Sequence, residues 1–333
     1  MIRRSLGAAG SVVFVVAVLA GSVRAGEETT ISGFVDASYF GNVDTKEETF
    51  GLDQVEVDVE RVFGENGTLH ADLEWVKNGD DWTLAAEQGY LTYRPDGAER
   101  LAFTLGKFNA PIGFELLDAP DIYQYSHALV FIYALPTNLT GAMVNADLAE
   151  GFDLAAYLVN GWDNNQESNG VKTFGGRLGY MPGEVVAAGL SAIRGSEGAD
   201  QQDMRTVVDL DLTVKPRKDL FFGGEFNYGK VEAGGNEATW TGCLAMAHYD
   251  ITGRIGLTGR FDYLDDPDTY VFGGAAGETR TAFTIAPTFT LGDGMGALIE
   301  VRVDQSSEDV FIDGDGETDG SETTVAFEMT YTF

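Results

Sequence analysis

The sequence predicts an all-β fold, a transmembrane antiparallel β-barrel of about sixteen strands with a long inward-folding loop after strand 5. Three observations predict it. The chain begins with a segment of secretory form, its body alternates apolar and polar residues, and it ends on an aromatic residue that completes a one-sided strand. Because lipid tolerates no open sheet edge, strands that cross a membrane must close into a barrel.

The N-terminal segment has the three parts of a secretory signal peptide. Arg3 and Arg4 precede an apolar run at 12–20, and Val23-Arg24-Ala25 has the small-x-small form of a cleavage site. The apolar run is shorter than the roughly 20 residues that a membrane-spanning helix needs. We therefore expect residues 1–25 to be a signal peptide cleaved after Ala25, and residues 26–333 to form a single outer-membrane barrel domain.

The charge of the chain excludes one class of partner and favours another. The formal net charge is −32, and the predicted signal peptide carries three arginines, so the mature chain is more acidic still. Nucleic-acid binding needs basic surface and is excluded. The acidity favours contact with cations, or with outer-membrane lipid and its cation-rich lipopolysaccharide layer. Cys243 is the single cysteine of the sequence, so no internal disulfide is expected.

The body of the chain consists of segments with period-two alternation. In one of them Val55, Val57 and Val59 interleave with acids, and 208–214 repeats the pattern. A half-solvated sheet in a soluble β-sandwich would alternate in the same way. The connections favour the barrel instead, because short links such as 64–67 and 215–219 alternate with longer polar links such as 110–137, 231–237 and 265–279.

In a barrel of this size the apolar set faces lipid and the polar set lines the interior. Carboxylates on such a wall lower the energy of cations and raise that of anions, which predicts a preference for cations. The alternative is that these charges only hydrate and cross-link the inner wall. The predicted pore-lining and selectivity residues are Glu56, Asp58, Glu60, Asp72, Glu74, Asp209, Asp211, Glu225, Arg260, Asp262, Glu300, Arg302 and Asp304.

The segment 106–140 departs most from alternation. A long loop in a compact domain is usually functional, and this one is predicted to fold inward and narrow the barrel. The residues assigned to this constriction loop are Lys107, Glu115, Asp118 and Asp121. Its acids are expected to face arginines of the wall across the opening. The apolar run 128–135 fits either the start of a strand or a short helix.

Several motifs in and after this loop carry a family resemblance. They are Gly106-Lys107-Phe108, Pro111-Ile112-Gly113-Phe114-Glu115, Tyr125-Ser126-His127, Thr140-Gly141 and Asn160-Gly161-Trp162-Asp163. In this order they resemble the motifs of the OmpL-like β-barrel porins and, more loosely, of the phosphate-selective porins. The resemblance implies a passive outer-membrane channel of a Gram-negative bacterium for small hydrophilic solutes, and a homotrimer. Phosphate-selective porins need pore-lining arginines and lysines, whereas the faces here are mostly acidic.

The last strand-like segment carries its large apolar side chains on one face. Phe327, Met329, Tyr331 and Phe333 share that face, because side chains alternate along a strand. A strand of this kind that ends on an aromatic residue resembles the assembly signal of outer-membrane barrels. We therefore expect the barrel-assembly machinery to bind it.

The remaining motifs favour neither a cofactor nor catalysis. The acidic stretch 313–320 resembles a calcium loop, but Thr318 and Thr324 stand where an EF-hand needs glycine and glutamate, so an acidic external loop is favoured. The histidines are scattered without metal-ligand spacing, so no metal site is predicted. Ser126 and His127 are adjacent, and neighbours on a strand point apart. An outer-membrane hydrolase and a closed barrel that acts as an adhesin or structural anchor remain the alternatives.

Overall fold

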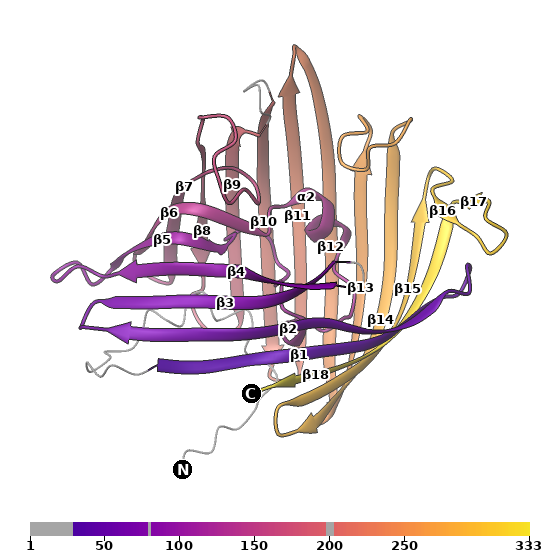
Figure 1. Ribbon diagram of the computed structural model, residues 1–333, viewed down its shortest axis with the longest axis horizontal. Coiled ribbons are helices and arrows are strands. Elements are labelled where there is room, and N and C mark those ends of the chain that lie inside the picture. The colour runs from indigo at the N-terminus through magenta and orange to yellow at the C-terminus, as the bar shows by residue number, and fades with distance from the viewer. Residues whose placement is uncertain (1–28, 79–80, 198–202) are drawn as a thin grey trace.

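The computed structural model describes residues 29–78, 81–197 and 203–333 of the chain. Its strands form a closed antiparallel barrel of sixteen strands, as the sequence predicted (Figure 1). The predicted cleavage site after Ala25 lies outside the described residues. The barrel strands are β1 (Thr29–Asn42), β2 (Glu48–Phe63), β3 (Gly67–Asn78), β4 (Asp81–Tyr93), β5 (Leu101–Asn109), β6 (Asn138–Asp147), β7 (Phe152–Val159), β8 (Thr173–Tyr180), β9 (Val186–Ser196), β10 (Met204–Arg217), β11 (Leu220–Ala233), β12 (Asn236–Thr252), β13 (Ile255–Asp266), β14 (Glu278–Gly292), β15 (Met295–Ser306) and β18 (Ser321–Thr332).

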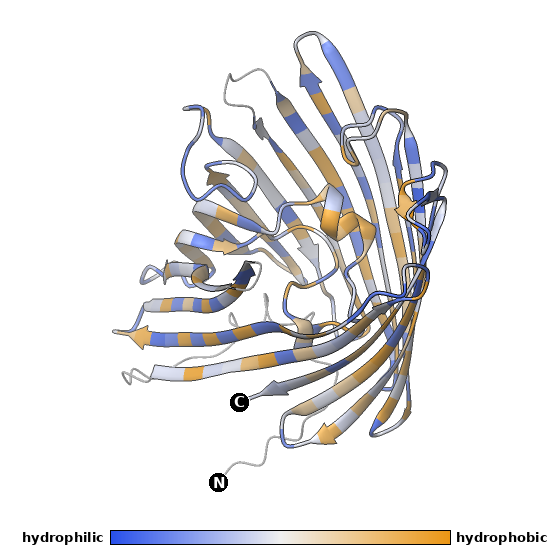
Figure 2. Ribbon diagram, turned by 45° about the vertical axis from the view of Figure 1, so that its right-hand side comes forward, coloured by the Kyte–Doolittle hydropathy of each residue, from blue (hydrophilic) through white to orange (hydrophobic). Residues whose placement is uncertain are grey.

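Alternation along each strand separates an apolar outer face from a polar inner face, as β10 illustrates. Leu210 and Leu212 are 51% and 45% exposed. Asp209, which precedes Leu210, and Asp211, which lies between the two leucines, are buried. Exposed leucines on the outside of a closed sheet suit contact with lipid, and acids can be buried only inside the barrel. The same striping of hydrophobic and hydrophilic residues runs along the other strands (Figure 2).

The connections differ in length, and one of them differs from the prediction. The expected long link at 231–237 is a tight turn of Gly234 and Gly235 between β11 and β12. Both glycines have positive φ, 58° and 90°, which lets two residues reverse the chain while the strands extend to the turn. The connection after β15 is long and contains its own small sheet of β16 (Phe311–Ile312) and β17 (Thr318–Asp319).

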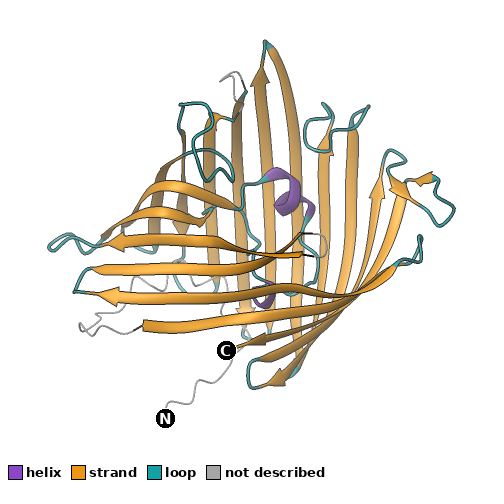
Figure 3. Ribbon diagram, in the orientation of Figure 1, coloured by secondary structure: helices purple, strands orange, loops and turns teal. Residues whose placement is uncertain are grey.

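The segment 110–137 after β5 folds into the barrel, as expected. It contains a short 3-10 helix, η2 (Ala119–Asp121), and an α-helix, α2 (Leu129–Ala134), both drawn inside the barrel in Figure 3. The apolar run 128–135 is therefore a helix and not a strand. It is buried because Ala128, Leu129 and Val130 pack into the apolar cluster beneath the loop. Within the described part of the chain, neither helix is long and apolar enough to cross a membrane.

A β-bulge in β4 changes the direction of one acidic side chain. Asp72 pairs with Gln88 and Leu73 pairs with Ala86, which leaves Glu87 as an extra residue without a partner position. A bulge places two successive side chains on the same side of the sheet and shifts the alternation that follows. Glu87 is consequently 5% exposed inside the barrel, although its spacing from outward-facing Leu91 predicts the outer face.

The barrel closes where the first strand pairs with the last. In β1 and β18, Phe34 lies opposite Thr332, and the backbone N–H of Phe333 donates to the carbonyl of Gly33 at 3.1 Å. The aromatic and apolar side chains of the last strand are exposed on its outer face. They are Phe327, Met329, Tyr331 and Phe333.

Candidate functional site

The inward loop is held to the barrel wall by a buried ion pair. The Arg260 guanidinium on β13 donates to Glu115 Oε1 at 2.7 Å and to the Ser126 carbonyl at 2.7 Å, and its Nε donates to Asp262 at 2.9 Å. The side chains of Arg260 and Glu115 are 0% and 3% exposed. Burial alone would raise the pKa of Glu115, but the Arg260 guanidinium, the His127 ring and the Ala128 N–H together outweigh burial and hold that pKa below its usual range.

Other wall residues hold the backbone of the loop. Glu300 accepts hydrogen bonds from the N–H groups of Tyr125 and Ser126 at 2.9 and 3.2 Å. Arg302 donates to the His127 carbonyl at 2.7 Å, and Glu225 accepts from the Phe114 N–H at 2.7 Å. We expected the loop acids to face wall arginines across an opening. Instead Glu115 contacts Arg260 directly, and this ion pair offsets the cost of burying the carboxylate.

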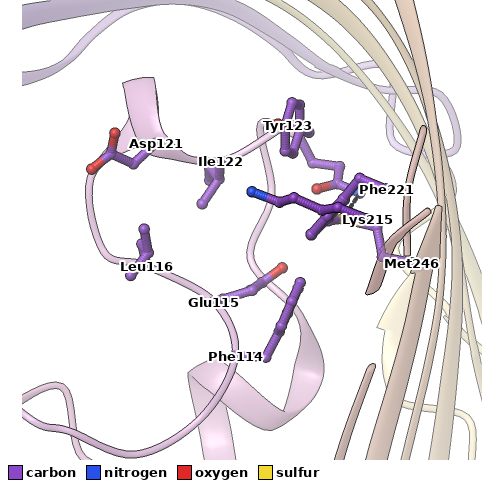
Figure 4. A pocket seen from close by; sticks show the side chains of 10 residues that line it. Phe114, Glu115, Leu116, Asp121, Ile122, Tyr123, Lys215, Phe221 and Met246 are labelled. Carbon is purple, nitrogen blue, oxygen red and sulfur yellow. Dashed lines mark hydrogen bonds between the residues drawn. The ribbon is translucent and has the colours of Figure 1, made fainter. Parts of the chain in front are cut away.

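Aromatic packing fixes the same loop against β11 and β12. Figure 4 shows Phe114 and Tyr123 of the loop on one side and Phe221 and Met246 of the wall on the other. The rings of Phe114 and Phe221 stack with centroids 6.0 Å apart. A Cβ at Gly223 would lie 2.1 Å from the Phe114 ring, so this position on β11 has room only for glycine while the loop is docked.

Asp118 lies in a different environment from Glu115. It approaches Glu56 of β2 and Glu87 of β4, and one carboxylate oxygen of each lies within 4.8 Å of the others. Burial, with the nearby carboxylates Glu87 and Asp121, raises the pKa of Asp118 to about 8. Contrary to our expectation, Asp118 forms no ion pair with an arginine in the described residues. Glu87 was absent from the predicted site, because only the bulge turns it inward.

The other predicted site residues differ in how far their side chains are buried. Glu74 and Asp58 are half-buried, Glu60 and Asp121 are exposed, and Lys107 lies on β5, where its Nζ donates to the Ala86 carbonyl at 3.0 Å. The predicted pore-lining residues that are buried inside the barrel are Glu56, Asp72, Asp209, Asp211, Glu225, Arg260, Asp262, Glu300, Arg302 and Asp304. The role of this set in selectivity stays a prediction.

Arginines of the inner wall lie beside acids. Arg177 forms a bidentate pair with Asp211, and its NH2 group lies 2.8 Å from Oδ1. Arg302 pairs with Asp304 at 2.7 Å, and Arg280 pairs with Glu278. Their charge is therefore largely compensated within the wall.

Comparison with known sequences identifies the family of the chain. The family described as "Putative beta-barrel porin-2, OmpL-like" matches residues 42–333. The chain belongs to this family. No curated protein matches the OmpL-like porin in sequence.

Solved structures similar to this chain include outer-membrane channels. The outer membrane channel DcaP of Acinetobacter baumannii has a TM-score of 0.71 at 12% identity, covering 94% of this chain and 99% of its own. An anion-selective porin from Comamonas acidovorans has a TM-score of 0.68 at 12% identity, covering 92% and 100%. OmpF of Salmonella typhi, in complex with daunomycin, has a TM-score of 0.65 at 11% identity, covering 92% and 98%.

At these identities the neighbours establish the fold and not the permeating solute. The family and the barrel together make this chain an outer-membrane porin of a Gram-negative bacterium.

Proposed function

We propose that this porin forms a water-filled channel through which small hydrophilic solutes diffuse passively, with a preference for cations. The observation that carries the preference is an excess of acids without a basic partner inside the barrel. In the described residues no ion pair involves any member of this set, and we call them the unpaired acids. They are Asp36, Glu56, Glu87, Asp118, Asp209, Glu225 and Glu328.

Four arginines of the inner wall, Arg177, Arg260, Arg280 and Arg302, have carboxylate partners by contrast. A compensated guanidinium attracts anions weakly, whereas uncompensated carboxylates attract cations and repel anions. The inward loop would filter solutes by size, because the Arg260, Glu225 and Glu300 contacts hold it inside the barrel. The Comamonas porin is named for anion selectivity, and that name describes a protein only 12% identical to this one.

The direct test is single-channel conductance of the refolded mature chain in a planar bilayer with a KCl gradient. We expect stable conductance steps and a reversal potential that favours potassium, because the unpaired acids enrich cations in the lumen. A reversal potential favouring chloride would remove the cation preference and keep the channel. An absence of steps from folded protein would contradict the channel itself and favour the closed-barrel adhesin or anchor.

We also propose that the porin is not an enzyme. A serine hydrolase needs its nucleophile within hydrogen-bonding distance of a positioned base. In the described residues no hydrogen bond joins the Ser126 hydroxyl to the His127 ring. The hydroxyl lies 3.3 Å from an Arg260 nitrogen, and the ring stacks on Phe131 with centroids 4.1 Å apart. A hydrolase screen on lipids and peptides would test the alternative.

The processing, assembly and partners of the chain are proposed from its sequence and relatives. Residues 1–25 would be removed as a signal peptide, leaving 26–333 as one barrel domain among outer-membrane lipid and lipopolysaccharide. A homotrimer is proposed because one neighbour, Vibrio cholerae OmpT, is described in a trimer form, with a TM-score of 0.65 at 13% identity. We propose neither an organic cofactor nor a nucleic-acid partner for this porin.

Deletion of Phe333 is expected to slow insertion of the barrel in cells. The Phe333 side chain is 54% exposed on the outer face of β18, so its removal takes little packing from the finished barrel. The measurement is the amount of heat-modifiable barrel in isolated outer membranes, with Phe289→Ala on β14 as the control. Equal insertion of both variants would contradict an assembly role for the last residue.

A further inference from the structure

Three carboxylates from three separate segments meet inside the barrel. Glu56 comes from β2, Glu87 from β4 and Asp118 from the inward loop, and one oxygen of each lies within 4.8 Å of the others. Two oxygens that bind the same Ca²⁺ ion at roughly 2.4 Å can lie at most about 4.8 Å apart. The separation of these oxygens is therefore compatible with a shared ion. We call Glu56, Glu87 and Asp118 the carboxylate cluster.

A second observation is that the cluster contains buried oxygens without donors. Both carboxylate oxygens of Glu87, and one oxygen each of Glu56 and Asp118, are buried and lack a hydrogen-bond partner in the described part of the chain. Glu56 and Glu87 are 2% and 5% exposed. Buried charges in proteins are paired or bind metal ions, because an isolated buried carboxylate is costly. The bulge in β4 aims the unpartnered Glu87 into the cluster.

The surroundings of the cluster add negative charge. Asp58, Asp72 and Asp121 lie close enough to act electrostatically on Asp118. No lysine, arginine or histidine forms an ion pair with the cluster among residues 29–78, 81–197 and 203–333. The negative charge of the cluster must therefore be neutralised by protons or by a bound cation.

The loop backbone is held where Asp118 enters the cluster. Asp118 directly precedes η2, and the N–H of the following residue, Ala119, lies 3.5 Å from Gln54 Oε1 on β2. The Asp118 side chain makes no capping hydrogen bond to η2, so it does not serve the helix. Its position beside β2 and β4 is therefore a second place where the loop meets the wall, in addition to the Arg260 contact on β13.

We propose that Glu56, Glu87 and Asp118 bind one Ca²⁺ ion, which ties the inward loop to β2 and β4. Carboxylate oxygens are hard ligands, and Ca²⁺ accepts 6–8 of them in irregular geometry. Three carboxylates can supply up to six oxygens, and lumen water completes the shell. Mg²⁺ fits less well, because it demands octahedral geometry and usually takes only one or two carboxylates. The site goes beyond the channel function and stands whether or not the pore prefers cations.

Calorimetric titration of the refolded mature barrel with CaCl₂ tests the proposal. The protein is first stripped with a chelator, and about 150 mM KCl screens weak binding to surface acids. The variants are Glu87→Gln and Asp118→Asn, which each remove one carboxylate ligand and keep the shape of the side chain. Asp315→Asn is the matched control, because Asp315 is exposed on the 313–320 loop, the other calcium-like sequence in the chain.

We expect one Ca²⁺ per chain in the wild type, with affinity at least roughly tenfold weaker in Glu87→Gln and in Asp118→Asn and unchanged in Asp315→Asn. Calcium should also raise the thermal unfolding temperature of the wild type and of Asp315→Asn, but not of the two cluster variants. Both cluster variants replace a carboxyl group that has no ion-pair partner and should fold. Heat-modifiability on gels confirms folding, and either folded variant decides the result.

Two outcomes would overturn the proposal. In the first, the cluster variants bind calcium as the wild type does, which places the ion elsewhere. In the second, the wild type binds no more calcium than Glu87→Gln, which means that shared protons neutralise the cluster. Channel conductance is recorded separately in chelator, so failure of the calcium site and failure of the porin function remain distinguishable.

Discussion

Replacement of Arg260 by methionine is expected to release the inward loop and give a larger, unstable conductance. The substitution leaves Glu115 buried without its guanidinium partner and removes the bond to the Ser126 carbonyl. Breaking a buried ion pair by removing one partner costs about 3–5 kcal/mol. Since 1.4 kcal/mol is a factor of ten, the ratio of docked to released loop should fall by roughly 10² to 4 × 10³.

Single-channel recording distinguishes this effect from general damage. Arg260→Met should show frequent transitions between the wild-type level and a higher level, whereas Arg254→Met, on an exposed turn, should leave the trace unchanged. Arg260→Lys should give an intermediate result, because an ammonium cannot form the forked contacts of a guanidinium. Wild-type conductance in Arg260→Met would mean that the Glu225 and Glu300 contacts hold the loop alone.

The pH dependence of wild-type gating should follow the same ion pair. Arg260 lowers the pKa of Glu115 in the docked loop, so the free energy of docking that this pair contributes is complete above the free glutamate value of about 4.3. It is lost as the pH falls through the lower docked pKa. Acidification below about pH 4 should therefore induce transitions that resemble those of Arg260→Met at neutral pH.

Removal of three unpaired acids from the wall is expected to reduce the cation preference strongly. The variant is Asp36→Asn, Asp209→Asn and Glu328→Gln, and these side chains are 3%, 0% and 2% exposed on β1, β10 and β18. They make no hydrogen bond to the inward loop in the described residues, so the loop should remain docked. Because one charge at 4 Å is worth about 1 kcal/mol even in water, we expect the permeability ratio of potassium to chloride to fall about threefold or more.

The reversal potential in a KCl gradient is the measurement, and the control removes the same number of charges elsewhere. Asp309→Asn, Asp315→Asn and Glu317→Gln lie exposed on the connection between β15 and β18. If the wall acids set selectivity, only the first variant moves the reversal potential toward zero. Equal shifts in both variants would assign the preference to the overall charge of the protein, and no shift in either would support wall cross-linking as the role of the acids.

The barrel could be predicted from the sequence because its strands repeat one simple rule. The leucines of β10 alternate with buried aspartates, and each further strand adds an independent instance of the same pattern. The inward loop was predictable by the same reasoning, since 110–137 breaks the alternation over the longest stretch. Its helix α2 remained open, because a short apolar run fits either a strand or a helix.

The contacts of the site could not be predicted from the sequence, for two physical reasons. Arg260 and Glu115 are 145 positions apart, and nothing local shows which of many acids the arginine meets. The inward direction of the Glu87 side chain depends on one extra residue in the register of β3 and β4. Such a shift moves a side chain to the other face of the sheet, and no residue type in the sequence indicates it. Gly234 and Gly235 were a readable signal of a tight turn, but the polar residues around them suggested a longer loop.

The pairing of β1 with β18 also constrains the order of events in biogenesis. Phe34 and Thr332, which lie opposite each other, come from nearly the two ends of the chain. In this barrel β1 has no partner on one edge until β18 pairs with it, so the unpaired backbone groups of that edge stay open until the last strand is in place. Contacts of such large sequence separation also form slowly, because the entropy of loop closure must be overcome first. The edges of the sheet therefore remain open for pairing with other chains until the twelve residues of β18 join β1 to β15.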